Sequence, residues 1–194
     1  MIKIKKATEL TNRQWYLFFK FVANYYKKNV IESNKNPVAN KMKMTLLYQG
    51  YAERTLARIK NGNLEAFVQL SYDPVENGDV PTGFITAYIE EENELLRITN
   101  LFITDTHPFK ALGIKALFEP MATYAKEHGI TRTFTTSDLL MPELSDSLEI
   151  LGFDQGTLHG TEIPYGLGFE PEELAGIEVV DGKRITFKRN FSSR

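Results

Sequence analysis

The sequence predicts an α/β protein in which strands and helices alternate along the chain. Two segments carry this prediction. Within residues 64–72 an apolar side chain stands at every second position, Leu64, Ala66, Val68, Leu70 and Tyr72, which is a strong strand signal. Residues 95–129 begin with a strand-like pattern and end with apolar residues at helical spacing, so we expect a strand, a loop and a helix there.

Composition limits the classes of function. The chain has 194 residues, of which 42% are hydrophobic, and this favours one domain over 1–194 with a sizeable core. A net charge of −2 argues against nucleic acid and anionic membranes as partners. Cysteine is missing, which excludes thiol chemistry and fits a cytoplasmic protein. No metal is expected, because His107, His128 and His159 lie at no ligand spacing.

The first third of the chain predicts one strand and two helices. Ile2 and Ile4 alternate with lysines, as in a half-buried strand. Residues 11–14 match a capping box, and a stripe of aromatic residues at helical spacing follows. We expect a long polar loop over 27–44, then a second helix that ends at Gly62.

The middle of the chain predicts three strands. After the strand at 64–72 we expect a turn over 73–81 and a strand over 84–89. An acidic tip leads into the strand that begins at Leu95. The apolar phase of that strand slips by one residue, which predicts a β-bulge near Thr99–Asn100.

The following helix carries an apolar stripe and ends at Gly129. Its stripe consists of Ile114, Leu117, Phe118, Met121 and Ala125. Ala111 and Gly113 are small residues where this helix begins, and two interpretations stay open. Either they let an anion approach the unpaired N–H groups of the helix start, or they allow the loop to pack closely on the sheet.

The C-terminal third predicts further strands with an insertion, over 154–194. Before it we expect a strand at 130–136, a loop at 137–141 and a helix that ends at Gly152. Within it, residues 164–168 suggest an irregular insertion. Residues 177–188 suggest a β-hairpin with a two-residue turn, which would supply the last strands of the sheet.

Two segments carry a resemblance to a known family. Residues 108–115 resemble the acetyl-CoA motif of the GCN5-related N-acetyltransferases (GNAT), Gln/Arg-x-x-Gly-x-Gly/Ala before a helix. Pro108 replaces the Gln/Arg, Ala111 the first glycine, and Gly113 keeps the second. Residues 147–153 are similar to the family's late segment "FYEKLGF". Together with the order of elements, the resemblance implies a mixed, mostly antiparallel sheet with helices on both faces.

The resemblance also implies a co-substrate and a site. Acetyl-CoA would be bound by the main chain at the end of the strand and by the start of the helix, with no metal. The implied contact residues are Leu101, Phe102, Ile103, Phe109, Lys110, Ala111, Leu112, Gly113, Ile114 and Lys115. A Gly113→Glu substitution is expected to block the phosphates and leave the fold intact.

The implied catalytic groups are where this sequence departs from the family. Arg97 stands at the strand position where some members carry a glutamate base, and Leu148 stands where a tyrosine acid is common. Tyr124 and Ser145 are the remaining candidates, so the catalytic residues stay unknown.

Three functional hypotheses follow. The first is an N-acetyltransferase that moves acetyl from acetyl-CoA to a primary amine of a small molecule or peptide by direct attack. The second is a GNAT-fold protein that binds CoA or a partner without catalysis. The third is an α/β interaction protein whose resemblance is accidental. The resemblance and the extra hairpin also favour a homodimer.

Overall fold

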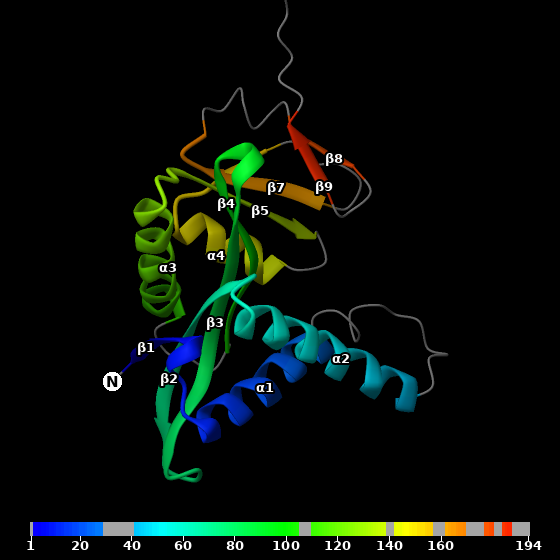
Figure 1. Cartoon of the computed structure of the whole chain (residues 1–194), viewed down its shortest axis with the longest axis vertical. Helices are drawn as coiled ribbons and strands as arrows, with labels where there is room; N and C mark the ends of the chain where they lie inside the picture. Colours follow the sequence, from blue (N-terminus) through cyan, green and yellow to red (C-terminus); the bar gives the residue numbers. More distant parts are fainter. Residues whose placement is uncertain are drawn as a thin grey trace, which may run out of the picture. The chain divides into compact units, whose positions relative to one another are not determined.

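The computed structural model describes residues 2–28, 41–104, 110–138, 142–156, 162–169, 177–180 and 184–187 (Figure 1). The elements are β1 (Lys3–Lys6), η1 (Ala7–Glu9), α1 (Asn12–Tyr26), α2 (Lys41–Lys60), β2 (Glu65–Asp73), β3 (Gly78–Glu90), η3 (Glu91–Asn93), β4 (Leu95–Ile103), α3 (Lys110–Glu127), β5 (Arg132–Asp138), α4 (Pro142–Ile150), β6 (Asp154–Gln155), β7 (Glu162–Leu167), β8 (Ile177–Val180) and β9 (Arg184–Phe187). None of these helices, among the residues described, is long and apolar enough to cross a membrane.

Seven strands form one mixed sheet in the order β1-β2-β3-β4-β5-β7-β6, and β8 pairs with β9 apart from it. The pairs β1/β2, β2/β3, β5/β7 and β6/β7 are antiparallel. Strand β4 pairs in parallel with β5, through Leu95–Arg97 and Arg132–Phe134. The mostly antiparallel mixed sheet is therefore confirmed.

The chain divides into two compact units, 1–87 with 100–121 and 88–99 with 122–194. We call them the first and the second unit. A single domain over 1–194 stays a prediction.

In the first unit, α1 covers one face of β3 and β4 through aromatic side chains. The predicted capping box begins the helix: Thr11 Oγ1 accepts from the Gln14 amide, and Gln14 Oε1 accepts from the Thr11 amide. Farther along, the ring centroid of Phe18 lies 5.7 Å from that of Phe84, and the ring centroid of Tyr25 lies 5.1 Å from that of Phe102. Offset and edge-on aromatic pairs of this kind stabilise the fold beyond the contribution of the apolar area that they bury.

The start of α3 covers the opposite face of the same strands. Successive residues of a strand point to opposite faces, so Ile103 turns away from α1 where Phe102 turns toward it. A Cβ built on Gly83 would lie 2.8 Å from Ile103 Cγ1, 2.9 Å from the Phe102 carbonyl oxygen and 3.2 Å from Leu117 Cδ1. Because that space is filled, glycine at position 83 lets strand and helix approach closely.

In the second unit, α4 and the strands β5 to β7 enclose a small core. Leu148, Phe153 and Tyr165 are buried there. The helices α3 and α4 are followed by Gly129 and Gly152, whose φ angles of 74° and 80° lie in the left-handed region. Both glycines were predicted as helix stops, and both predictions are confirmed.

Two boundaries in the first half of the chain were predicted wrongly. The expected loop over 27–44 is too long, because α2 begins at Lys41; residues 29–40 lie outside the described part. The expected turn over 73–81 is also too long, because β3 begins at Gly78. Here Gln69 pairs with Gly83 but Leu70 pairs with Pro81, so Thr82 is an extra residue that breaks the alternation from which a strand is recognised.

The C-terminal strands also differ from expectation. Residues 164–168 are not an irregular insertion, because most of them lie in β7, which pairs with β5 and β6 on its two sides. The strand predicted at 130–136 runs over Arg132–Asp138. The hairpin at 177–188 is confirmed, but it forms its own two-stranded sheet instead of completing the main one. Val180 pairs with Arg184, so three residues separate the two strands where a two-residue turn was expected; residues 181–183 lie outside the described part.

The β-bulge expected near Thr99–Asn100 stays a prediction. Burial alternates from Leu96 to Asn100 and then changes phase, since Asn100 and Leu101 are both buried. The polar Asn100 side chain is satisfied by donating to Thr86 Oγ1 at 2.8 Å.

The contact at Gly83 predicts opposite outcomes for two glycine-to-alanine substitutions. We expect Gly83→Ala to lower the free energy of unfolding by about 1–3 kcal/mol, because the added methyl group overpacks β3 against β4 and α3. In Gly50→Ala, a Cβ would meet nothing within 4 Å, and we expect a gain of about 0.5–1 kcal/mol from helix propensity. Urea unfolding of both variants measures this, and equal effects would contradict the packing described here.

A second prediction concerns alkaline stability. Burial raises the pKa of the Tyr25 phenol above its ordinary value of 10.0, and the neighbouring Tyr26 adds to the shift. The neutral phenol therefore stabilises the fold fully below about pH 10, and this contribution is lost as the pH rises through the raised folded-state pKa. The free energy of unfolding should fall more steeply above pH 10 in the wild type than in Tyr25→Phe.

Urea titrations between about pH 8 and 11 test this. Tyr72→Phe is the matched control, because Tyr72 is 61% exposed, and its slope should equal that of the wild type. A Tyr25→Phe slope that matches the wild type would contradict the argument.

Candidate functional site

The candidate site begins where β4 ends, in the first unit. Leu101 and Ile103 are buried, and Phe102 is half-buried with its ring against α1. The side chains of these predicted site residues therefore serve the core. What β4 can offer a ligand here is its main chain. The chain leaving β4 is held in place because the Thr104 amide donates to the Thr82 carbonyl at 2.9 Å.

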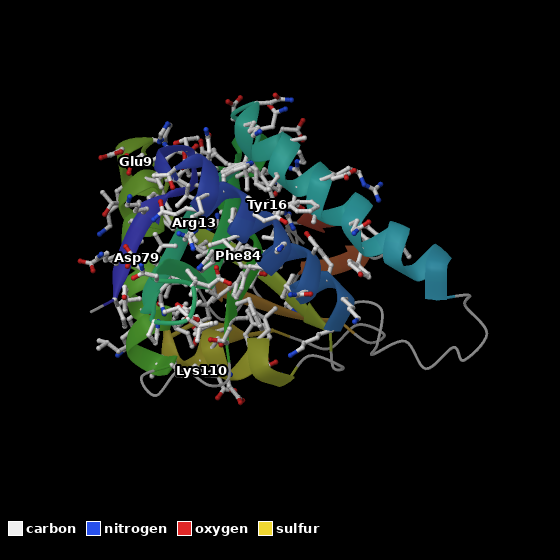
Figure 2. The ribbon with its side chains drawn as sticks, turned by 90° about the horizontal axis from the view of Figure 1, so that it is seen from below. Glu9, Arg13, Tyr16, Asp79, Phe84 and Lys110 are labelled. Atoms are coloured by element: carbon white, nitrogen blue, oxygen red, sulfur yellow. The ribbon has the colours of Figure 1, made fainter. Side chains whose placement is uncertain are left out.

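The second part of the site is the first turn of α3. Ala111 and Lys115 are exposed, Lys110 is half-buried, and Leu112 is 60% exposed. Figure 2 shows the side chains from below, with Lys110 labelled. The first N–H groups of a helix have no partner within it, and the helix dipole makes this end positive. An exposed first turn of an 18-residue helix with two nearby lysines fits an anionic group such as a pyrophosphate. Pro108 and Phe109 lie outside the described residues.

Gly113 faces the sheet and not the solvent. A Cβ at this position would lie 2.8 Å from Gln69 Oε1 and 3.0 Å from Ile103 Cδ1. Ile114, its neighbour in the stripe, is buried on the same side. Of the two interpretations left open for this glycine, close packing is the one that its surroundings support. We therefore expect Gly113→Glu to destabilise the fold as well as to block the phosphates, because the side chains of Gln69 and Ile103 would have to move to make room for it.

This packing brings two predicted segments together. The contact between Gly113 and Ile103 sets the first turn of α3 directly against the end of β4. Ala111 and Leu112, on the other side of the same turn, stay open to solvent. One turn thus presents its packed face to the sheet and its exposed face to a ligand.

Sequence reasoning missed Gln69, a fully buried side chain beneath this turn. Its Nε2 donates to Thr82 Oγ1 at 3.2 Å, and the Thr82 hydroxyl is 3.3 Å from Ser71 Oγ. Gln69 lies between the apolar positions of the strand pattern, so that pattern alone gives no reason to single it out. The apolar stripe of the helix at 110–127 could have indicated its burial, because this helix must cover one face of the sheet.

The two catalytic candidates belong to the second unit. Tyr124 lies in the last turns of α3, with its ring 4.5 Å from that of His128 and its carbonyl oxygen 2.8 Å from His128 Nδ1. These contacts give it a role in closing the helix. Ser145 is half-buried in α4. Neither residue belongs to the unit that holds the end of β4 and the first turn of α3.

Arg97 and Leu148 stand at the positions where the resembled family carries a base and an acid, and both side chains pack within the protein. Arg97 Nε and Nη2 donate to one oxygen of Glu90 at 3.0 and 2.6 Å, and the guanidinium lies 5.3 Å from the centre of the Phe134 ring. Leu148 is fully buried. Neither side chain can move a proton at neutral pH.

A groove lies between α1 and α2, away from the predicted residues. It has a volume of about 380 Å³, and its lining residues are Asn12, Trp15, Tyr16, Phe19, Glu53, Leu56, Ala57 and Lys60. Its aromatic faces already hold ammonium groups, since Lys60 Nζ is 5.1 Å from the Trp15 ring centre and Lys20 Nζ is 4.5 Å from that of Tyr16. Among the described residues, no cluster of His, Asp and Glu side chains could hold a metal ion.

Comparison with known proteins identifies the fold. No protein-family model matches the chain, and no curated protein matches its sequence. Solved structures do match. A PaiA N-acetyltransferase from Thermoplasma acidophilum, in complex with coenzyme A, is 13% identical with a TM-score of 0.61, over 86% of this chain and 98% of that one.

Two further structures agree with this match. A GNAT-family acetyltransferase from Staphylococcus aureus is 13% identical with a TM-score of 0.59, over 86% of this chain and 98% of that one. An acetyltransferase from Streptococcus agalactiae is 17% identical with a TM-score of 0.56, over 85% and 96%. The resemblance that the sequence suggested is confirmed in three dimensions: this chain has the fold of the GNAT acetyltransferases.

Proposed function

We propose that this protein is an acetyl-CoA-dependent N-acetyltransferase that acts on a primary amine of a small molecule or peptide. The observation that carries the proposal is the first turn of α3, which is packed on the end of β4 by Gly113 and exposed at Ala111 and Leu112. The fold adds support, because one of the similar structures contains coenzyme A. A homodimer and a cytoplasmic location remain predictions.

The proposal gives each part of the site one task. The main-chain N–H groups at the start of α3, among them those of Ala111 and Leu112, would bind the pyrophosphate, because the first N–H groups of a helix have no acceptor within it and lie at the positive end of its dipole. Lys110 and Lys115 would add positive charge. The main chain of Phe102 and Ile103 would hold the acetyl and pantetheine arm.

Acetyl-CoA supplies an activated acyl group, a thioester with a good leaving group. The neutral amine attacks the acetyl carbonyl carbon, so that a C–N bond forms and the C–S bond breaks. The nitrogen loses a proton, and the departing thiolate takes one up. A main-chain N–H at the end of β4 would stabilise the oxygen that becomes negative during attack.

A second candidate is a protein that binds CoA without catalysis. Two observations favour it: Leu148 is fully buried where an acid is expected, and Arg97 is paired with Glu90 where a base is expected. Water can replace both groups, because a thiolate needs little protonation to leave. Release of free CoA in the presence of a panel of amines separates the candidates, since the enzyme would release it and the binding protein would not.

The binding site is tested by reversing the charge on its exposed face. Ala111→Glu places a carboxylate in the first turn of α3. There the carboxylate interacts favourably with the helix dipole but repels phosphate. We expect calorimetric titration with CoA to give an affinity at least about tenfold weaker than wild type. Ala111→Gln, which has the same shape without the charge, should stay within about threefold of wild type.

The unfolding free energy of Ala111→Glu should stay within about 1 kcal/mol of wild type, so that lost binding cannot be ascribed to a lost fold. Equal CoA affinity in the Glu and Gln variants would remove the first turn of α3 as the phosphate site. ATP is the ligand control, because a general affinity for nucleotide phosphates would show with it as well.

A further inference from the structure

The buried amide of Gln69 lies directly beneath the proposed ligand-binding turn. We propose that Gln69 is a positioning residue for this turn: its Oε1 accepts a hydrogen bond from a main-chain N–H of the first turn of α3 when that turn holds a phosphate group. The inference rests on the proposed function, and it adds a residue that neither the sequence motif nor the resemblance assigns.

The amide of Gln69 is held at one end. Nε2 donates to Thr82 Oγ1 at 3.2 Å, and Thr82 in turn pairs with Ser71 at 3.3 Å. Thr82 is the extra residue of the bulge between β2 and β3, and its carbonyl oxygen accepts from the Thr104 amide. The same residue therefore anchors the Gln69 side chain and the chain leaving β4.

The other end of the amide is unpartnered. Gln69 is 0% exposed, and its Oε1 has no hydrogen-bond partner in the part of the chain that the structure describes. Burial of an acceptor without a partner is unfavourable and uncommon in native proteins, so each such atom needs a physical explanation. This oxygen points at Gly113, 2.8 Å from the position of its absent Cβ.

The first turn of α3 supplies the donors that Oε1 lacks. Its N–H groups have no acceptor within the helix. A phosphate would hold this turn from its exposed face, at Ala111 and Leu112, while Oε1 lies against its packed face at Gly113. A small adjustment of the turn on binding would bring one of its N–H groups to Oε1. The phosphate and Oε1 would then accept from different N–H groups of one turn and favour the same placement of that turn. Each therefore strengthens the other, which couples ligand binding to an internal hydrogen bond.

The test replaces the amide by an apolar side chain of similar length. Gln69→Met keeps the volume between β2 and Gly113 but removes the acceptor. We expect calorimetric titration to show CoA affinity about 3- to 10-fold weaker than wild type, the effect of one lost net hydrogen bond in the bound state only. The midpoint of urea unfolding without ligand should stay close to that of wild type, because removal of an unpartnered buried oxygen offsets the loss of the hydrogen bond to Thr82.

A second variant tests the same hydrogen bond without changing Gln69, in case Gln69→Met fails to fold. Thr82→Val keeps Gln69 but removes the hydroxyl that orients its amide, and it should weaken CoA binding in the same direction. Thr55→Val is the matched control, because it removes a buried hydroxyl that bonds Tyr26 at 2.8 Å between α1 and α2. That variant should be less stable than wild type and bind CoA equally well.

The outcomes separate this inference from the proposed function. Wild-type affinity in Gln69→Met would overturn the role of Gln69 and leave the acetyltransferase proposal standing. A loss of affinity in Gln69→Met that the Thr55→Val control shows equally would reduce the effect to general destabilisation and also overturn it. Failure of the wild type to bind CoA would overturn the proposed function, and this inference with it.

Discussion

The close approach of α3 to the sheet is the contact on which the candidate site depends. Gly83 on β3 and Gly113 on α3 leave no space for a side chain, and Ile103 of β4 lies against both. Because the start of α3 packs on the end of β4 in this way, the first N–H groups of the helix and the last main-chain groups of the strand come together. Gly113, which the sequence suggested as a ligand contact, thus packs against the sheet and so positions the first turn of α3.

Much of the first unit could be predicted from local patterns. The capping box at Thr11, the alternation of β2 and the stop at Gly62 each report on a few neighbouring residues, and local rules suffice for them. The apolar stripe of α3 likewise predicted which face is buried: Ile114, Leu117 and Met121 are all in the core. The two segments of the predicted site, the end of β4 and the start of α3, do lie against each other.

What the sequence did not predict depends on contacts distant along the chain. The bulge at Thr82 arises from pairing with β2, so the start of β3 could not be seen in its own residues. Strand β7 contains Pro164 and Gly166, which disfavour a strand locally, but pairing on both sides holds it in the sheet. Gln69 could not be singled out, because the helix that covers its face of the sheet begins some forty residues later in the sequence.

We propose that the first turn of α3 and the end of β4 together hold CoA. Hydrogen–deuterium exchange of the wild-type protein, with and without saturating CoA, tests it most directly because it reports on the main-chain amides themselves. Amide exchange should slow on binding in peptides that cover 101–104 and 110–115, and it should change little in β8 and β9. Binding of CoA with protection confined to other segments, such as the groove between α1 and α2, would contradict this proposal.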